Sequence, residues 1–345
     1  MKKRIAVVLF NLGGPDSLSA VRPFLFNLFN DPAIIGIPAP FRWILAHYIA
    51  FRRAPVARNI YRYIGGKSPL LAMSQQQARE LERQLSDDGD IKCFVAMRYW
   101  HPMISEISDQ VKKFGPDEIV LLPLYPQYSS TTTGSSLTEW QRAAKEINLS
   151  QVARIICCYP TMKGWVAAQV DLISHELKNV SHGTSCRILF SAHGLPKKII
   201  DSGDPYQIQI EQTVEAIVAD LPDGTDWVIC YQSRVGRLEW IGPSTEKELG
   251  RAADDGVEIV IVPIAFVSEH SETLVELDIE YRELAEKSGI SGYYRVPTVG
   301  TNVKFINGLA DLVRQSLNCD DHVTSDTRDS KGRCLAKFDK CPLVK

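Results

Sequence analysis

EIVLLP at residues 118–123 returns almost unchanged as EIVIVP at residues 258–263. Runs of Val, Ile and Leu without polar alternation are typical of strands that are buried on both faces of a parallel sheet. Three further pairs of similar segments follow in the same order: 9–13 with 189–194, Cys93 with Cys230, and 159–161 with 296–298. Four matches in one order indicate an internal duplication, in which Cys93 and Cys230 are expected at equivalent positions of their strands.

Eight apolar runs are the expected strands, and they fall into two sets of four. They cover residues 5–10, 91–97, 119–124 and 154–158 in the first half, and 187–192, 227–232, 258–264 and 293–296 in the second. Helical patterns separate them, and the first is an apolar stripe that follows Asp16 or Ser17 as its N-cap. Strands that alternate with helices predict an α/β fold with parallel sheets and right-handed crossovers.

The first half is longer than the second, and the excess falls on residues 31–69. This stretch is rich in aromatic side chains and arginines, and several prolines interrupt it. One interpretation is a lid over a flat apolar ligand that carries acidic groups, or a patch that contacts a membrane surface. The other is an ordinary helical hairpin packed on the core, and both stay open at this point.

The composition excludes several classes of protein. The 345 residues carry a formal net charge of −2 and 45% are hydrophobic, so no basic field exists to hold nucleic acid. No apolar run is long enough to span a bilayer, and the start of the chain lacks the cleavage site of a signal peptide. Several of the eight cysteines lie inside apolar runs, which favours reduced thiols and a cytoplasmic location over a disulfide scaffold.

Polar side chains follow the expected strands, at the edge where ligands bind in open α/β sheets. The run 125–136 offers hydroxyls that either donate to an anion or cap the next helix. His193 ends the fifth strand, where its ring could accept a proton or bind a metal.

A row of carboxylates follows the seventh strand. Glu272, Glu276 and Glu280 recur every four residues, on one face of the expected α-helix, beside Glu269 and His270. Like charges at this spacing repel each other. The row is either a solvated acidic face or a path that delivers a cation to the histidine.

These motifs together resemble the ferrochelatases, the enzymes that insert ferrous iron into a porphyrin. The matching segments are NLGGPDS at 11–17, YPQYSSTTTGSS at 125–136, SAHGLP at 191–196 and FVSEHSETLVELDIEY at 266–281. The resemblance implies two similar Rossmann-like domains, each with a four-stranded parallel sheet flanked by helices. It places the porphyrin in a cleft between them, under a lip formed by residues 31–69. The expected division is 1–165, 166–317 and a cysteine-containing tail, 318–345.

The resemblance also assigns roles to single residues. The catalytic positions of the family fall on His193, Glu272 and His270. The expected metal ligands are His193 and Glu272. It stays open which of these two takes up protons and which binds iron. The residues expected to contact the porphyrin are Leu12, Arg62, Ser68, Arg98, Tyr99, Tyr125, Ser130 and Trp240. The expected path for protons or metal is Glu269, Glu276 and Glu280.

The implied reaction inserts Fe²⁺ into a porphyrin, with protoporphyrin IX preferred, and releases two protons in the terminal step of haem biosynthesis. A chelatase for another metal or tetrapyrrole, such as coproporphyrin or a sirohydrochlorin-type ring, is an alternative, and so is a non-catalytic haem or metal carrier. Retention of both His193 and Glu272 argues against a carrier, which needs no base. The expected partners are porphyrin and ferrous iron, without nucleic acid or organic cofactor, and with peripheral membrane contact at most. The oligomeric state stays open.

Some ferrochelatases carry a [2Fe–2S] cluster on three C-terminal cysteines and one from mid-chain. Here Cys319, Cys334 and Cys341 would be the three. The family's mid-chain position is Ser130 in this sequence, so Cys158 would have to supply the fourth ligand. The other interpretation is a tail with incidental thiols.

Overall fold

The computed structural model describes residues 3–326 and 338–342, apart from 235 and 237. The chain divides into two compact units, and each is described by itself. The first comprises Met1–Cys158 and Leu309–Ser325, and the second comprises Tyr159–Gly308 and Asp326–Lys345. This division differs from the expected boundaries after residues 165 and 317, because the last helix is shared and part of the expected tail adds a strand to the first sheet.

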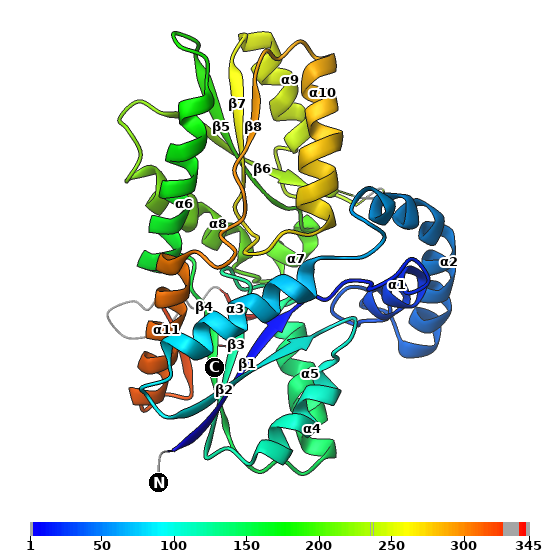
Figure 1. The fold of residues 1–345 in the computed structure, drawn as a ribbon. Helices are drawn as coiled ribbons and strands as arrows, with labels where there is room; N and C mark the ends of the chain where they lie inside the picture. Colours follow the sequence, from blue (N-terminus) through cyan, green and yellow to red (C-terminus); the bar gives the residue numbers. More distant parts are fainter. Residues whose placement is uncertain (1–2, 235, 237, 327–337, 343–345) are drawn as a thin grey trace. The chain divides into compact units, whose positions relative to one another are not determined.

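The first unit is built on a parallel sheet with the strand order β2-β1-β3-β4-β9 (Figure 1). The strands are β1 (Arg4–Asn11), β2 (Asp90–Met97), β3 (Glu118–Pro123), β4 (Ala153–Cys158) and β9 (Val323–Ser325). The helices are α1 (Val21–Phe29), α2 (Ala39–Tyr63), α3 (Leu70–Gln84), α4 (Ile104–Phe114) and α5 (Thr133–Glu146). Helix α11 (Val303–Asn318) begins in the second unit and ends in the first.

The second unit repeats this plan with the strand order β6-β5-β7-β8. Its strands are β5 (Cys186–His193), β6 (Asp226–Gln232), β7 (Glu258–Pro263) and β8 (Tyr293–Arg295). Its helices are α6 (Lys163–Glu176), the short 3₁₀ turn η1 (Leu177–Asn179), α7 (Lys197–Asp201), α8 (Tyr206–Val218), α9 (Thr245–Asp255), the π-helix η2 (Glu272–Glu280) and α10 (Tyr281–Lys287).

All eight predicted strands form, and every pairing between them is parallel. The expected fold of two similar parallel sheets flanked by helices is therefore confirmed. The first sheet has one strand more than expected, because β9 pairs with β4. The sequence of β9 is Val-Thr-Ser, which is too short and too polar for a hydrophobic pattern to reveal.

The strand register corrects one detail of the duplication. The prolines that end β3 and β7 pair with Phe10 and Ser191. On the other side of those two residues lie Ala96 and Cys230. Cys230 therefore corresponds to Ala96 and not to Cys93, so the expected equivalence of the two cysteines is wrong by three residues. Continuous apolar runs lack the alternation that would fix a register.

Helix α1 begins later than predicted. Its first residue is Val21 and its N-cap is Ala20. The Ser17 hydroxyl accepts a hydrogen bond from the backbone N–H of Ala20 at 3.3 Å. Ser17 therefore stabilises a turn that precedes the helix, and neither Asp16 nor Ser17 is the N-cap.

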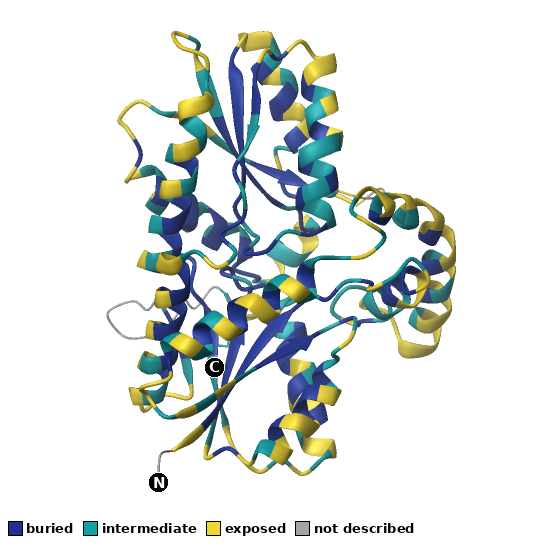
Figure 2. Cartoon of the chain, viewed as in Figure 1, coloured by how far each residue is buried: buried dark blue, intermediate teal, exposed yellow. Residues whose placement is uncertain are grey.

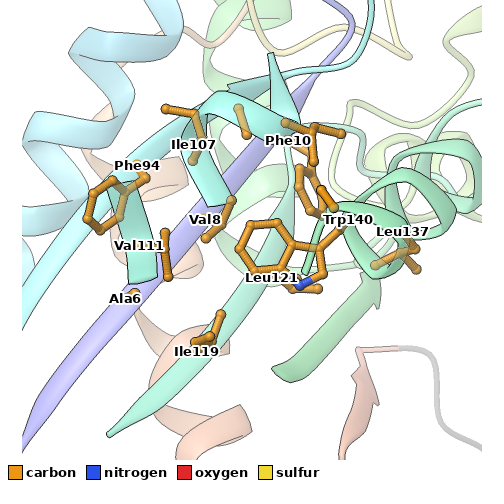
Figure 3. Packing of buried hydrophobic residues seen from close by; sticks show 13 residues of the cluster. Ala6, Val8, Phe10, Phe94, Ile107, Val111, Ile119, Leu121, Leu137 and Trp140 are labelled. Atoms are coloured by element: carbon orange, nitrogen blue, oxygen red, sulfur yellow. The ribbon is translucent and has the colours of Figure 1, made fainter. Parts of the chain in front are cut away.

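The core of the first unit shows why β1 reads as an unbroken apolar run. Strand β1 lies inside the sheet, and Ala6, Val8 and Phe10 on one of its faces are fully buried beneath α4 and α5 (Figure 3). The rings of Phe10 and Trp140, which belongs to α5, lie 6.1 Å apart between centroids. Burial of this kind is the main favourable contribution to folding.

Helix α2 lies in the expected lip and presents two different faces. Ala46, Ala50 and Ala54 are buried, and Ala50 and Ala54 belong to a core cluster shared with α1. Figure 2 shows much of the rest of α2 as exposed, and its exposed large apolar side chains are Phe41, Trp43, Ile44, Leu45, Tyr48, Phe51, Val56 and Tyr63. The helix contains five arginines and no Asp or Glu. Helices α1 and α2 therefore pack against each other as a hairpin, and the outer face of α2 carries both apolar side chains and arginines.

Among the residues that the structure describes, no helix combines the length and the apolar character needed to cross a bilayer.

Candidate active site

His193 is the last residue of β5, at the carboxyl end of the second sheet. The next residue, Gly194, donates its backbone N–H to the carbonyl of Gln232 at 2.9 Å. A Cβ atom at Gly194 would lie 3.0 Å from that oxygen, so this close approach favours glycine. The Tyr206 hydroxyl donates to the carbonyl of His193 at 3.0 Å. The peptide group that follows the histidine is therefore held at both its carbonyl and its N–H.

Glu272 lies between two histidines. Its Oε2 atom is 2.9 Å from Nδ1 of His193 and 3.8 Å from Nε2 of His270. The Nδ1 atom of His270 is 3.2 Å from the carbonyl oxygen of Ser268. Because a carbonyl only accepts, Nδ1 of His270 donates to it, and Nε2 is the ring nitrogen that faces Glu272.

The pair of His193 and Glu272 favours the charged forms of both groups. Burial lowers the pKa of His193, but the charge of Glu272 and the hydrogen bond to it outweigh burial, so the net shift is upward. Burial alone would raise the pKa of Glu272, and the charge and hydrogen bond of His193, with His270, move it well below its usual range instead. The side chains of His193 and Glu272 are 38% and 26% exposed, which keeps them accessible.

The carboxylate row corrects one expectation, because Glu272–Glu280 forms a π-helix and not an α-helix. In a π-helix each N–H bonds five residues back, and such helices are rare and frequent at functional sites. The Glu276 carboxylate accepts from the backbone N–H of Ser233 at 2.8 Å and from its hydroxyl, and also from Nε2 of Gln232 at 3.1 Å. Burial and the charge of Glu272 raise the pKa of Glu276.

Ser233, which donates two hydrogen bonds to Glu276, has an unusual backbone conformation. Its φ is +61°, in the left-handed region that favours glycine. The predicted site residues did not include Ser233, Gln232 or Tyr281, whose hydroxyl donates to Glu276 at 3.1 Å. Their position could have indicated them. Gln232 is the last residue of β6 and Ser233 is the next one, so both lie at the same edge of the sheet as His193.

The other two members of the predicted path are placed differently. The Glu269 carboxylate is ion-paired with Arg295 at 2.7 Å and accepts from the backbone N–H of Thr298 at 2.9 Å. Burial would raise the pKa of Glu269, and Arg295 lowers it more strongly. Glu280 ends the π-helix and is exposed to solvent.

In the first unit, Arg98 and Tyr99 share a carboxylate that the sequence analysis missed. Asp31 Oδ2 accepts from Nη2 of Arg98 at 2.9 Å, from the Tyr99 hydroxyl at 2.7 Å and from the Ser135 hydroxyl. Asp31 is 4% exposed and Tyr99 is fully buried. Nε of Arg98 donates to Ser135 at 2.7 Å, while its Nη1 has no hydrogen-bond partner among the described residues. No local pattern marks Asp31, which lies far from Arg98 in the sequence.

The remaining predicted porphyrin contacts differ in exposure. Leu12, Tyr125, Ser130 and Ser68 are half-buried in the first unit, and Arg62 is exposed at the end of α2. Trp240 is half-buried in the second unit, and its buried indole Nε1 has no partner among the described residues. An unpartnered buried N–H can serve a ligand.

The predicted cluster cysteines are divided between the units. Cys158 and Cys319 belong to the first unit and Cys341 to the second, while Cys334 lies outside the described residues. The Cys158 thiol is fully buried, 3.4 Å from that of Cys157 and 3.2 Å from the Ser325 hydroxyl.

The arrangement at the end of the second sheet suits a metal in transit. Within the described ranges, no three His, Cys, Asp or Glu side chains gather in a way that could hold a metal ion. Glu272 and the Nε2 atom of His270 face each other as two ligand atoms, and Nδ1 of His193 lies 2.9 Å from the same carboxylate. Imidazole nitrogens beside a carboxylate suit ferrous iron and can also move protons.

Comparison with known proteins identifies the family of the chain. The family model described as Ferrochelatase matches residues 4–317. The chain is 51% identical over 345 residues to a ferrochelatase of Caulobacter vibrioides, which covers 99% of this chain and 98% of the relative. It is 48% identical over 348 residues to a ferrochelatase of Pelagibacter ubique, with 100% and 99% covered.

Among solved structures, SirB from Bacillus subtilis with Fe³⁺ superposes with a TM-score of 0.54 over 92% of this chain and 96% of that one. At 14% identity this likeness shows the fold alone. With the family model and full-length relatives in agreement, the chain belongs to the ferrochelatase family.

Proposed function

We propose that this chain inserts Fe²⁺ into protoporphyrin IX, with His193 as the acceptor of the pyrrole protons. Membership of the ferrochelatase family carries the reaction class: the chain is a lyase that inserts ferrous iron into a porphyrin in haem synthesis. Metal insertion replaces two pyrrole N–H protons with one Fe²⁺, so the protein must receive two protons for each turnover.

One observation carries the role of His193. Its Nδ1 atom is committed to Glu272, whereas its Nε2 atom has no hydrogen-bond partner in the described part of the chain. The ring is partly exposed, and the peptide group that follows it is held by two hydrogen bonds. In the neutral ring, Nε2 accepts a proton from the porphyrin, and the Glu272 carboxylate stabilises the imidazolium that forms.

Glu276 is the next group that moves protons away from the porphyrin. Glu272 accepts a hydrogen bond from His193, and Glu276 is its neighbour on the same helix with a raised pKa. A carboxyl whose pKa is raised accepts a proton more readily than one at its usual value. Glu280, at the exposed end of the row, releases protons to solvent. Glu269 takes no part in this path, because Arg295 holds its carboxylate.

Iron enters as a substrate. Glu272 and His270 Nε2 supply an oxygen and a nitrogen ligand atom that face each other. With only these donors the ion binds weakly, as transfer to the porphyrin nitrogens requires.

The residues that we propose for porphyrin binding lie in the first unit, apart from Trp240, which lies in the second. Arg98, with one edge held by Asp31 and Ser135, has Nη1 available for a propionate, and Arg62 and Ser68 supply further polar contacts. Leu12, Tyr125, Ser130 and Trp240 contact the macrocycle. A rigid site that fits a bent macrocycle better than a flat one lowers the barrier to metal entry.

The test is anaerobic incubation of the purified protein with Fe²⁺ and one porphyrin at a time, followed by loss of the fluorescence of the metal-free ring. We expect rapid loss with protoporphyrin IX and slower loss with coproporphyrin. Faster turnover of coproporphyrin would contradict protoporphyrin IX as the substrate. Binding of haem without any metal insertion would show that the protein is a carrier and not an enzyme. Turnover with Co²⁺ or Ni²⁺ but not with Fe²⁺ would contradict ferrous iron as the metal.

The exposed face of α2 supports a peripheral contact of this otherwise cytoplasmic protein with membranes. Aromatic and aliphatic side chains beside the exposed Arg52, Arg53 and Arg62, in a helix without acidic residues, suit an anionic lipid surface. We expect the protein to co-sediment with vesicles that contain phosphatidylglycerol and to stay in the supernatant with phosphatidylcholine alone. Phe51→Asp should release it, whereas Val152→Asp, at an exposed apolar residue outside α2, should not.

The [2Fe–2S] cluster stays a prediction. The described cysteines do not gather into a set of ligands, and Cys334 lies outside the described residues. No step of the reaction is therefore assigned to a cluster. Visible absorption and iron content of anaerobically purified protein test it, and an active, colourless, iron-free preparation would contradict it.

A further inference from the structure

Arg295, the last residue of β8, holds two carboxylates that belong to different segments. Its Nε and Nη2 atoms each lie 2.7 Å from an oxygen of Asp278, within the π-helix η2. Its Nη1 atom lies 2.7 Å from Glu269, directly before His270. The Arg295 side chain is only 11% exposed. A guanidinium that binds one carboxylate through two parallel hydrogen bonds fixes orientation as well as distance.

Further hydrogen bonds join β8 to the same helix. The Tyr293 hydroxyl donates to the carbonyl of Leu277 at 2.7 Å, and Nε of Arg282 donates to the carbonyl of Asp278 at 3.2 Å. Nη1 of Arg282 donates in turn to the carbonyl of Tyr293 at 2.9 Å. Side chains thus take up backbone carbonyls near the end of the π-helix, as expected where a rare helix form is stabilised by its surroundings.

The geometry points to Arg295 as a positioning residue that keeps η2 in its π form and so holds Glu272 against His193. The inference rests on the proposed function, because the catalytic role of the Glu272–His193 pair is part of that proposal. Arg295 contacts neither residue. It acts through Glu269, on the loop that carries His270, and through Asp278, which follows Glu272 and Glu276 on the helix. Glu269 therefore belongs to this clamp.

The test compares Arg295→Met with Arg154→Met. Arg154 is a matched control, because its side chain is 18% exposed and pairs with Glu118 at 2.6 Å in the first unit. The first readout is amide hydrogen exchange of residues 272–280 in the substrate-free protein. We expect exchange to be about tenfold faster in Arg295→Met, because hydrogen bonds to charged groups are lost. Arg154→Met should leave it unchanged.

The second readout separates kcat from KM. Arg295→Met should lower kcat by about 10- to 100-fold, as loss of an outer partner commonly does, while KM for the porphyrin stays near the wild-type value. Unchanged exchange in 272–280, or an equal loss of kcat in Arg154→Met, would overturn the inference. If Arg295→Met fails to fold, Asp278→Asn removes the same two-point contact and is measured in the same way.

The two readouts also separate this inference from the proposed function. Hydrogen exchange needs no porphyrin or iron. If the wild-type protein failed to insert iron but Arg295→Met still loosened residues 272–280 selectively, the proposed function would fall and the structural clamp would stand.

Discussion

The two units repeat one order of strands, yet the carboxyl ends of those strands carry different chemistry. In the first unit, Arg98, Tyr99 and Ser135 all donate to the buried carboxylate of Asp31. In the second unit, the corresponding edge carries His193 and Glu272, both partly exposed. Burial and the nearby Asp31 raise the pKa of Tyr99 well above its usual value, so its hydroxyl stays neutral. The Tyr99 hydroxyl therefore orients its hydrogen bond without exchanging a proton, whereas the pair in the second unit can exchange protons.

This difference shows how two copies of one fold can differ in role, with one orienting donors toward a ligand and the other exchanging protons. A fixed network orients donors toward a ligand without changing during a reaction. A histidine beside a carboxylate changes its protonation near neutral pH. We therefore expect substitutions in the first unit to act mainly on stability and porphyrin affinity, and those at His193 and Glu272 to act mainly on turnover.

The largest expected effect on turnover is that of His193→Ala. Loss of the proton acceptor should lower kcat by about 10²- to 10⁴-fold, with little change in the free energy of unfolding because the ring is partly exposed. Loss of porphyrin fluorescence measures kcat, and thermal unfolding measures stability. His101→Ala is the control, because His101 also pairs with a glutamate but is exposed in the first unit. Wild-type turnover in His193→Ala would remove the catalytic assignment.

Asp31→Ala should produce the largest loss of stability. It leaves Arg98 without its buried partner, and breaking a buried ion pair costs about 3–5 kcal/mol. Denaturant unfolding measures this loss. Asp88→Ala, which breaks the more exposed pair with Arg314, should cost about 0–1 kcal/mol. Equal costs of the two substitutions would show that the Asp31 network does not stabilise the first unit.

Much of the fold could be predicted because buried parallel strands appear in the sequence as unbroken apolar runs. The same property hides the register, which is why Cys230 was matched with Cys93 although it corresponds to Ala96. Strand β9 was missed because its three residues carry no pattern.

The candidate site was predictable where function sits directly at strand ends, as for His193. It was not predictable where the partner is distant in sequence, as for Asp31 with Arg98 or Glu269 with Arg295. The spacing of Glu272, Glu276 and Glu280 suits an α-helix and a π-helix alike, so the sequence could not distinguish them.

Glu272→Gln should change the pH dependence as well as the rate. The neutral form of His193 is the one that accepts a proton, so kcat/KM of the wild type should rise with pH through the raised pKa of His193. Removing the carboxylate leaves burial, which lowers that pKa, so the acid limb should move to lower pH. The rate at neutral pH should fall about 10- to 100-fold. A pH profile with an unmoved acid limb would show that Glu272 does not set the protonation of His193.

The smallest expected effect separates a hydrogen bond from a backbone conformation at Ser233. Its φ is +61°, whereas Tyr99, which corresponds to it in the first unit, is not among the residues with positive φ. Ser233→Gly and Ser233→Ala both remove the hydroxyl that donates to Glu276. Only alanine keeps a Cβ in the left-handed region, so the glycine variant should be more stable than the alanine variant by about 1 kcal/mol in denaturant unfolding.

Both Ser233 variants should lower turnover equally and by less than Glu272→Gln, because the backbone N–H of residue 233 still donates to Glu276. A larger loss of turnover in Ser233→Ala than in Ser233→Gly would mean that the left-handed turn, and not the hydroxyl, positions Glu276. In that case the two units would differ at this edge in backbone conformation as well as in side-chain chemistry.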